Sequence, residues 1–156
     1  MIFSISILIQ GNAEGFSDKR DISIASNPLK LIYSLVNLEI DYALFDELSF
    51  HVFSEYLLCD YIIKREDHPD FVIRTGPRFL LPFPGESCDT YIGPFISFSN
   101  SFLYNTSGIE AGVEMGGRYK LISRLFIQLK GMVMYSITTS KVIPGFEGLL
   151  GYSIKL

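Results

Sequence analysis

The stretch Val36-Asn37-Leu38-Glu39-Ile40-Asp41-Tyr42-Ala43-Leu44 decides the fold. Every even-numbered residue in it is apolar, whereas the odd-numbered residues are Asn, Glu, Asp and Ala. A repeat of two is the pattern of a β-strand with two different faces, because successive side chains point to opposite sides of the chain. The stretch therefore predicts a strand that separates an apolar environment from a polar one.

Similar segments of roughly ten residues follow one another along the chain, which is the strand length of a membrane barrel. We expect strands at residues 21–31, 36–44, 48–58, 71–81, 91–103, 109–119, 124–135 and 145–156, and turns or loops at residues 46–47, 65–70, 82–89, 105–108, 120–123 and 138–144. Pro28 predicts a kink in the first strand, because proline cannot donate to a strand ladder. No segment combines a helix start signal with a period of 3.6 residues.

Short connections make neighbouring strands antiparallel, and closure removes the two unpaired edges that an open sheet of strands would leave. The sequence therefore predicts an all-β fold, a closed antiparallel up-and-down barrel of about eight strands. The chain has 156 residues, of which 48% are hydrophobic and 19% charged. Soluble domains usually have about 25% charged residues, yet no run here reaches the roughly 18 apolar residues of a membrane helix.

The bulk of the apolar face indicates which side of the barrel it occupies. A barrel of about eight strands has an interior that side chains only just fill, so several large residues per strand would overfill it. The opposite face mixes charges with glycines, which suit a crowded interior. We therefore predict a transmembrane barrel, whose apolar face meets lipid and whose polar face fills the lumen.

The lumen-facing charges form the candidate site. We predict that they make an ion-pair network that fills the barrel and fixes its register, because unpaired buried charge is costly; the alternative is a narrow path lined by charge. In particular, Arg74 and Arg78 should each lie near Glu39, Asp41, Glu55, Glu110 or Glu114. The predicted network comprises Glu39, Asp41, Glu55, Arg74, Arg78, Glu110, Glu114, Arg118 and Lys130.

Tyrosines near strand ends or on the apolar face are candidates for aromatic girdles at the two membrane interfaces. They are Tyr33, Tyr42, Tyr56, Tyr91, Tyr119, Tyr135 and Tyr152.

Residues 1–13 carry no charged side chain and combine a short apolar run with small residues near a possible cleavage point. This pattern predicts a secretory signal peptide, followed by a barrel domain over residues 14–156. A basic start to the signal is missing, so the segment is either part of a longer signal or a first strand or N-terminal arm. Cys59 and Cys88 have no metal-ligand spacing, and we expect them near opposite rims as separate thiols.

The ending Gly151-Tyr152-Ser153-Ile154-Lys155-Leu156 resembles the C-terminal insertion signal of outer-membrane barrels. Tyr152, Ile154 and Leu156 match its alternating apolar residues, with Gly151 before them; the family usually ends in Phe rather than Leu. Residues 24–29 with residues 37–44, and the Gly-Pro motifs at Gly76 and Gly93, resemble strands of small barrels of the OmpX, OmpW and OmpA-barrel group.

The resemblance covers about residues 20–156 and implies a protein of the cell outer membrane. Its partners would be outer-membrane lipid and the barrel-assembly machinery, and we expect a monomer with no cofactor. A net charge of −4 without a basic patch argues against nucleic acid as a partner.

Some barrels of this kind are enzymes that act on lipid A, and the resemblance would allow a deacylase with a His-x-Ser pair. Here Ser54 lies one residue too far from His51, and no P-loop, G-x-S-x-G or zinc spacing is present. We expect no enzymatic activity, with His51 as a lumen-facing polar residue and His68 in a solvated loop.

The first functional hypothesis is a structural or surface-interaction protein of the outer membrane. One alternative is a conduit for small hydrophobic molecules through a lateral opening, for which Pro28, Pro77 and Pro94 are weak support; a dense ionic lumen would contradict it. The other alternative is a soluble calycin-like lipid carrier, which requires the apolar residues to point inward around a cavity.

Overall fold

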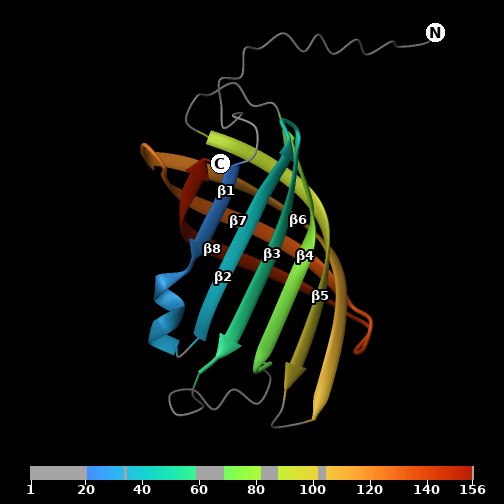
Figure 1. Ribbon diagram of the computed structural model, residues 1–156. Coiled ribbons are helices and arrows are strands. Elements are labelled where there is room, and N and C mark those ends of the chain that lie inside the picture. The colour runs from blue at the N-terminus through green and yellow to red at the C-terminus, as the bar shows by residue number, and fades with distance from the viewer. Residues whose placement is uncertain (1–20, 34, 59–68, 82–87, 102–104, 156) are drawn as a thin grey trace, which may run out of the picture.

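The computed structural model describes residues 21–33, 35–58, 69–81, 88–101 and 105–155. Its strands form one closed barrel in chain order (Figure 1). Each strand runs antiparallel to its neighbours, and pairing between the first and the last strand closes the wall. The strands are β1 (Asp21–Ser26), β2 (Leu35–Phe45), β3 (Leu48–Leu57), β4 (Phe71–Leu81), β5 (Cys88–Ser101), β6 (Thr106–Ile122), β7 (Leu125–Ser136) and β8 (Lys141–Lys155). The expected fold class, a closed up-and-down barrel, is confirmed.

Side-chain burial follows the alternation seen in the sequence. In β2 the buried residues include Asn37, Glu39 and Asp41, while Leu38 and Ile40 face outward. The same outward apolar pattern continues around the barrel; examples from other strands are Val52, Ile73, Ile92, Ile96, Val113, Met115, Leu129, Val133 and Leu150. The calycin-like alternative, which requires the apolar residues inside, is therefore wrong.

The first strand is shorter than predicted. β1 ends at Ser26, and a 3-10 helix, η1 (Pro28–Tyr33), takes the place of the expected strand extension. Ser26 pairs with Leu150 of β8, so continuing the register would set Pro28 opposite Gly148, at a position where a backbone N–H is needed. Proline has none, and the strand stops. Among the described residues no helix has the length and apolar character to cross a membrane.

Asn27 begins η1 in the manner of a helix N-cap. Its side-chain oxygen accepts a hydrogen bond from the Leu29 N–H at 2.9 Å, and its backbone carbonyl accepts one from the Lys30 N–H at 3.1 Å. Asn before a proline in the first helical position is a favourable start, because the missing proline N–H would have had no helical partner. The Asn27 N–H in turn donates to the Asn37 side chain at 2.7 Å, which ties η1 to β2.

Three other strands differ from the predictions in the opposite direction, because they begin earlier than expected. β5 begins at Cys88, inside the expected turn, and β6 extends over Thr106–Ile122. β8 begins at Lys141, where a loop to residue 144 was expected, because Val142 and Pro144 pair with β7. The signal segment, Cys59, His68, Leu156 and most of the loops at residues 65–70 and 82–89 lie outside the described residues.

Two Gly-Pro motifs meet across β4 and β5. The two strands pair at Thr75–Ile96 and Phe79–Ile92 but not between them, where Pro77 and Pro94 face each other. A Cβ at Gly76 would lie 2.1 Å from the Pro94 carbonyl oxygen, and one at Gly93 would lie 2.1 Å from that of Pro77. Glycine is required here because the two backbones are in contact. The prolines interrupt the ladder, but the strands do not part.

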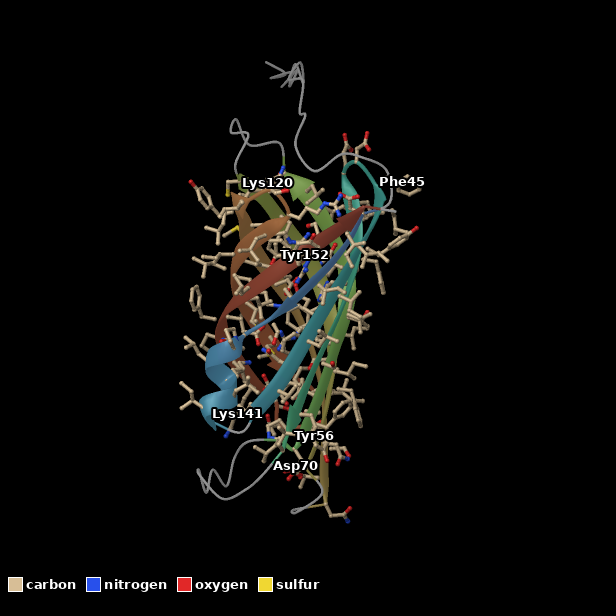
Figure 2. The ribbon with its side chains drawn as sticks, turned by 60° about the vertical axis from the view of Figure 1, so that its left-hand side comes forward. Phe45, Tyr56, Asp70, Lys120, Lys141 and Tyr152 are labelled. Atoms are coloured by element: carbon tan, nitrogen blue, oxygen red, sulfur yellow. The ribbon has the colours of Figure 1, made fainter. Side chains whose placement is uncertain are left out.

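The two ends of the barrel differ in their connections. Asp21, Lys155 and the tight turns at Asp46-Glu47 and Ser123-Arg124 share one end. The other end has η1, Asp70 and the four-residue turn at residues 137–140. Figure 2 shows Phe45 and Lys120 near the first end, and Tyr56, Asp70 and Lys141 near the second.

Candidate functional site: the charged interior of the barrel

The predicted lumen residues come together inside the barrel. Glu110, on β6, is half-buried and accepts a hydrogen bond from the Ser99 hydroxyl at 3.0 Å. The other predicted residues are all buried: Glu39, Asp41, Glu55, Arg74, Arg78, Glu114, Arg118 and Lys130.

Arg78 lies at the centre of this cluster. Its side chain, which is 0% exposed, is directed inward from β4. Its Nη1 donates to Glu39 Oε1 and to Asp41 Oδ2, each at 2.7 Å, and its Nε donates to Glu114 Oε1 at 2.5 Å. One guanidinium thus joins β4 to β2 and to β6, each two strands away in the wall. Such charge-assisted hydrogen bonds are about twice as strong as those between neutral groups.

Lys130 and Arg118 extend the network to β6 and β7. The Lys130 ammonium contacts Glu39 and lies 3.2 Å from Glu147 Oε2. Arg118 Nη2 lies 2.7 Å from Asp41 Oδ2, so each of these cations shares a carboxylate with Arg78.

Gln128 connects the same groups through neutral hydrogen bonds. Its side-chain oxygen accepts from Arg118 Nε at 2.8 Å. Its Nε2 donates to Glu39 Oε1 at 2.6 Å and to the Tyr91 hydroxyl at 2.9 Å. An amide has both a donor and an acceptor, so Gln128 bridges a cation to an anion without adding charge.

A second cluster lies where η1 meets the wall. Lys30 of η1 contacts Glu55 of β3 and lies 2.9 Å from Glu147 Oε1 of β8. Arg74 Nη1 lies 3.4 Å from Glu147 Oε2. Burial lowers the pKa of Lys30, but the Glu147 and Glu55 carboxylates outweigh it and raise that pKa above its ordinary value. Lys30 is therefore held as a cation between β3 and the part of β8 that lies beyond the end of β1.

Aromatic rings fill the space between the cations. Arg74 lies 5.0 Å from the ring centres of both Phe53 and Phe95, and Arg78 lies 4.4 Å from that of Tyr91. These distances allow cation–π attraction, which strengthens when the groups are desolvated.

Glycines directly opposite the aromatic residues on neighbouring strands make room for the rings, since Gly151 pairs with Phe126 and Gly116 pairs with Tyr91. A Cβ at Gly151 would lie 2.2 Å from Phe126 Cζ, and one at Gly116 would lie 2.6 Å from the Tyr91 hydroxyl oxygen. The small lumen residues noted in the sequence thus face interior aromatic side chains.

His51 is a buried polar side chain without a hydrogen-bond partner. It is 0% exposed, neither ring nitrogen has a hydrogen-bond partner, and Nε2 lies 3.7 Å from Glu114 Oε1. Ser54 is on the opposite face of β3, where its hydroxyl bonds the Leu38 carbonyl. Within the described part of the chain, no group of three or more His, Cys, Asp or Glu residues is placed to hold a metal ion.

Sequence reasoning left several members of the network out. Arg78 contacts acids from the predicted set, but the ion pair recorded for Arg74 is with Glu147, which was not in it. Lys30 was missed because it lies on a helix that was not expected, and Gln128 because it is neutral. The girdle prediction is wrong for Tyr91, which is 0% exposed in the interior. The sequence did indicate the interior position of Tyr91, because Tyr91 and the polar Ser97 are both odd-numbered residues of one strand and therefore point to the same face.

The C-terminal residues occupy alternating faces. Gly151 is in the interior, and Tyr152 and Ile154 face outward on β8. The thiol of Cys88, at the start of β5, is free and half-buried.

Comparison with known proteins gives a structural likeness. No protein-family model matches the chain, and no curated protein matches it. The crystal structure of the N-terminal β-barrel domain of Pseudomonas aeruginosa OprF superposes with a TM-score of 0.58. That alignment covers 87% of this chain and 98% of the OprF domain, at 15% sequence identity. The likeness shows a shared fold, that of an outer-membrane barrel domain.

Proposed function

We propose that this protein is an integral outer-membrane barrel with a structural or surface-interaction role, whose interior is closed by its ion-pair network. One observation carries the proposal: the polarity of the wall is reversed relative to a soluble protein. Charged side chains such as Arg78, Glu114 and Lys130 are buried inside, while large apolar side chains such as Ile96 and Met115 are about 60% exposed. Only a surrounding apolar medium makes such an outer surface favourable.

A closed barrel also fits the requirements of a lipid environment. Every backbone polar group within the hydrocarbon region needs a partner in the protein, and pairing of β1 with β8 leaves no open edge along the shared part of the wall. Exposed tyrosines lie towards both ends. Tyr119 and Tyr152 are close to the turn at Ser123-Arg124, whereas Tyr135 is close to the turn at residues 137–140 and Tyr56 lies near that second end. Their amphipathic rings suit the two membrane interfaces.

The connections suggest an orientation. Outer-membrane barrels have short turns on the periplasmic side and longer loops outside. The end with the turns at Asp46-Glu47 and Ser123-Arg124 would then be periplasmic, and the end with η1 and the turn at residues 137–140 would face the cell exterior. Partners at the surface would meet this second end.

The interior favours a closed lumen over a hydrophobic conduit. Arg78, Lys130 and Arg118 reach across the lumen to acids on other strands, so an apolar molecule would have to displace paired, buried charges. The Gly-Pro motifs of β4 and β5 bring the two strands into contact rather than opening the wall. We expect vesicles containing the protein to release a small trapped fluorophore no faster than empty vesicles.

Partners and assembly follow from the same proposal. Outer-membrane lipid would contact the apolar belt, which consists of the outward-facing apolar side chains such as Leu38, Ile96 and Val113. The barrel-assembly machinery would recognise the final residues around Tyr152 and Ile154. We propose a monomer, because one chain closes the barrel by itself.

Cysteine labelling in intact Gram-negative cells tests location and orientation together. In a chain with Cys59 and Cys88 replaced by Ser, we place one cysteine at Thr139 or, as the matched control, at Asp46; both positions are exposed turn residues. A membrane-impermeant maleimide should label Thr139→Cys in intact cells and Asp46→Cys only after the outer membrane is permeabilised. Recovery of the protein in the soluble fraction would contradict the proposal, and the reverse labelling pattern would contradict the orientation.

A further inference from the structure

The short helix η1 has one polar and one apolar side. Lys30 is directed inward, to Glu55 and Glu147. The neighbouring side chains Leu29, Leu31 and Ile32 are 66%, 58% and 64% exposed. Leaving three large apolar side chains in water is unfavourable, because transfer of apolar surface out of water is the main favourable term in folding and association. The exposed side of η1 therefore favours an apolar neighbour.

The position of η1 indicates which neighbour this is. Figures 1 and 2 both show η1 against the outside of the wall, beside the lower part of β2, and not across the mouth of the barrel. The nearest outward-facing residues of β2 are Val36 and Leu38, which belong to the apolar belt. The exposed side of η1 thus continues the surface that meets lipid.

The part of β8 that does not pair with β1 indicates how deep in the membrane η1 lies. β8 pairs with β1 only from Leu150 onward, and within the described residues Lys141–Leu149 have register partners on β7 alone. The Ser153 N–H donates to the Arg124 carbonyl at the start of β7, and N–H groups alternate in direction along a strand, so those of Phe146 and Gly148 lie on the side that β1 leaves open. An open sheet edge is not tolerated in hydrocarbon. The hydrocarbon must end close to the level at which β1 stops, and η1 begins at that level.

We propose that η1 is a lipid-contact site at the membrane interface, in which Leu29, Leu31 and Ile32 insert among the acyl chains while Lys30 fastens the helix to the barrel. The inference rests on the proposed membrane location. The occupant is the surrounding bilayer, because the apolar side of η1 is continuous with the lipid-facing belt. Apolar residues that lie at the boundary of headgroups and acyl chains are the mode by which interfacial helices bind membranes.

The chain contains no Trp, so a single introduced Trp reports on one position. We compare Ile32→Trp with Val113→Trp in the middle of the belt and with Thr139→Trp in the turn at the same end of the barrel. Each full-length variant is refolded into phosphatidylcholine vesicles whose acyl chains carry bromine either near the headgroup or near the bilayer centre. Leu29→Trp serves as a second reporter if Ile32→Trp does not fold.

The inference predicts that Trp at 32 loses emission chiefly with lipid brominated near the headgroup, whereas Trp at 139 is quenched by aqueous iodide. If Ile32→Trp is quenched by neither brominated lipid, the inference is wrong. Quenching by iodide would then place this residue in water, whereas no quenching by iodide would place it under a protein partner. Val113→Trp distinguishes a failure of this inference from a failure of the proposed membrane location. If that residue is quenched and Trp at 32 is not, only this inference fails; if neither is quenched, the proposed membrane location fails with it.

Discussion

At the scale of single residues, Arg78 binds three carboxylates at once. Replacing it with Met keeps a long side chain but leaves Glu39, Asp41 and Glu114 short of a buried cation. Breaking a buried ion pair in this way costs about 3–5 kcal/mol. We expect Arg78→Met to lower the free energy of unfolding by that amount, measured by urea titration of the barrel in lipid vesicles.

The matched control is Arg124→Met, at an exposed turn position. Substitutions at such positions usually change stability by less than about 0.5 kcal/mol. Equal urea midpoints for the two variants would contradict a central role for Arg78.

Gly151 should not tolerate a methyl group, because a Cβ there would lie 2.2 Å from Phe126 Cζ. Overfilling a packed interior costs about 1–3 kcal/mol, so Gly151→Ala should lower the free energy of unfolding by that amount. Gly131→Ala is the control, since nothing lies within 4 Å of its Cβ position. Adding Phe126→Leu to Gly151→Ala should recover part of the loss. Similar costs at Gly151 and Gly131 would contradict the packing described.

The sequence could place these residues on a face but could not choose their partners. Alternation puts Glu39 and Arg78 inside, because parity alone decides the face. Which acid meets which cation depends on the stagger of strands that are far apart in the chain, such as β2 and β7. Glu147 was on the predicted polar face, yet its contacts with Lys30 and Lys130 follow from the shape of the barrel.

At the scale of elements, strands with clear alternation were predictable almost to the residue, as β4 shows. β1 was not, because Asn27-Pro28 can mean either a kinked strand or a helix start. The choice between the two depends on whether Pro28 falls at a position whose backbone N–H must donate to β8. That position is known only once the register with β8 is known. The early start of β8 was missed for a related reason: Pro144 resembles a loop residue until its strand is known to border an open edge.

The N-cap at Asn27 gives a test of η1 as an element. Asn27→Ala removes the acceptor for the Leu29 N–H, and loss of such a cap costs about 1 kcal/mol. Asn27→Asp keeps an oxygen acceptor at the same place and should retain most of the stability. Urea titration in vesicles compares both variants with the unmodified chain. If Asp is as damaging as Ala, the cap is not what holds the start of η1.

At the scale of the whole molecule, a closed barrel with an apolar exterior was predictable, because strand length, alternation and the bulk of the apolar face agree. The sequence also pointed to a charged interior. It did not show the aromatic side chains that share that interior, since Phe53 and Tyr91 look like lipid-facing residues when charge alone marks the inside. The likeness to the OprF barrel domain supports the fold, and the reversed polarity of the wall supports the membrane.

The most direct test of this central claim is the electrophoretic mobility of the full chain, unheated against boiled, after refolding with and without detergent. We predict a heat-dependent mobility shift that appears only with detergent, because the folded barrel requires an apolar medium around it. A monodisperse, β-rich protein without detergent would contradict the account, since the exposed apolar belt should not remain soluble alone.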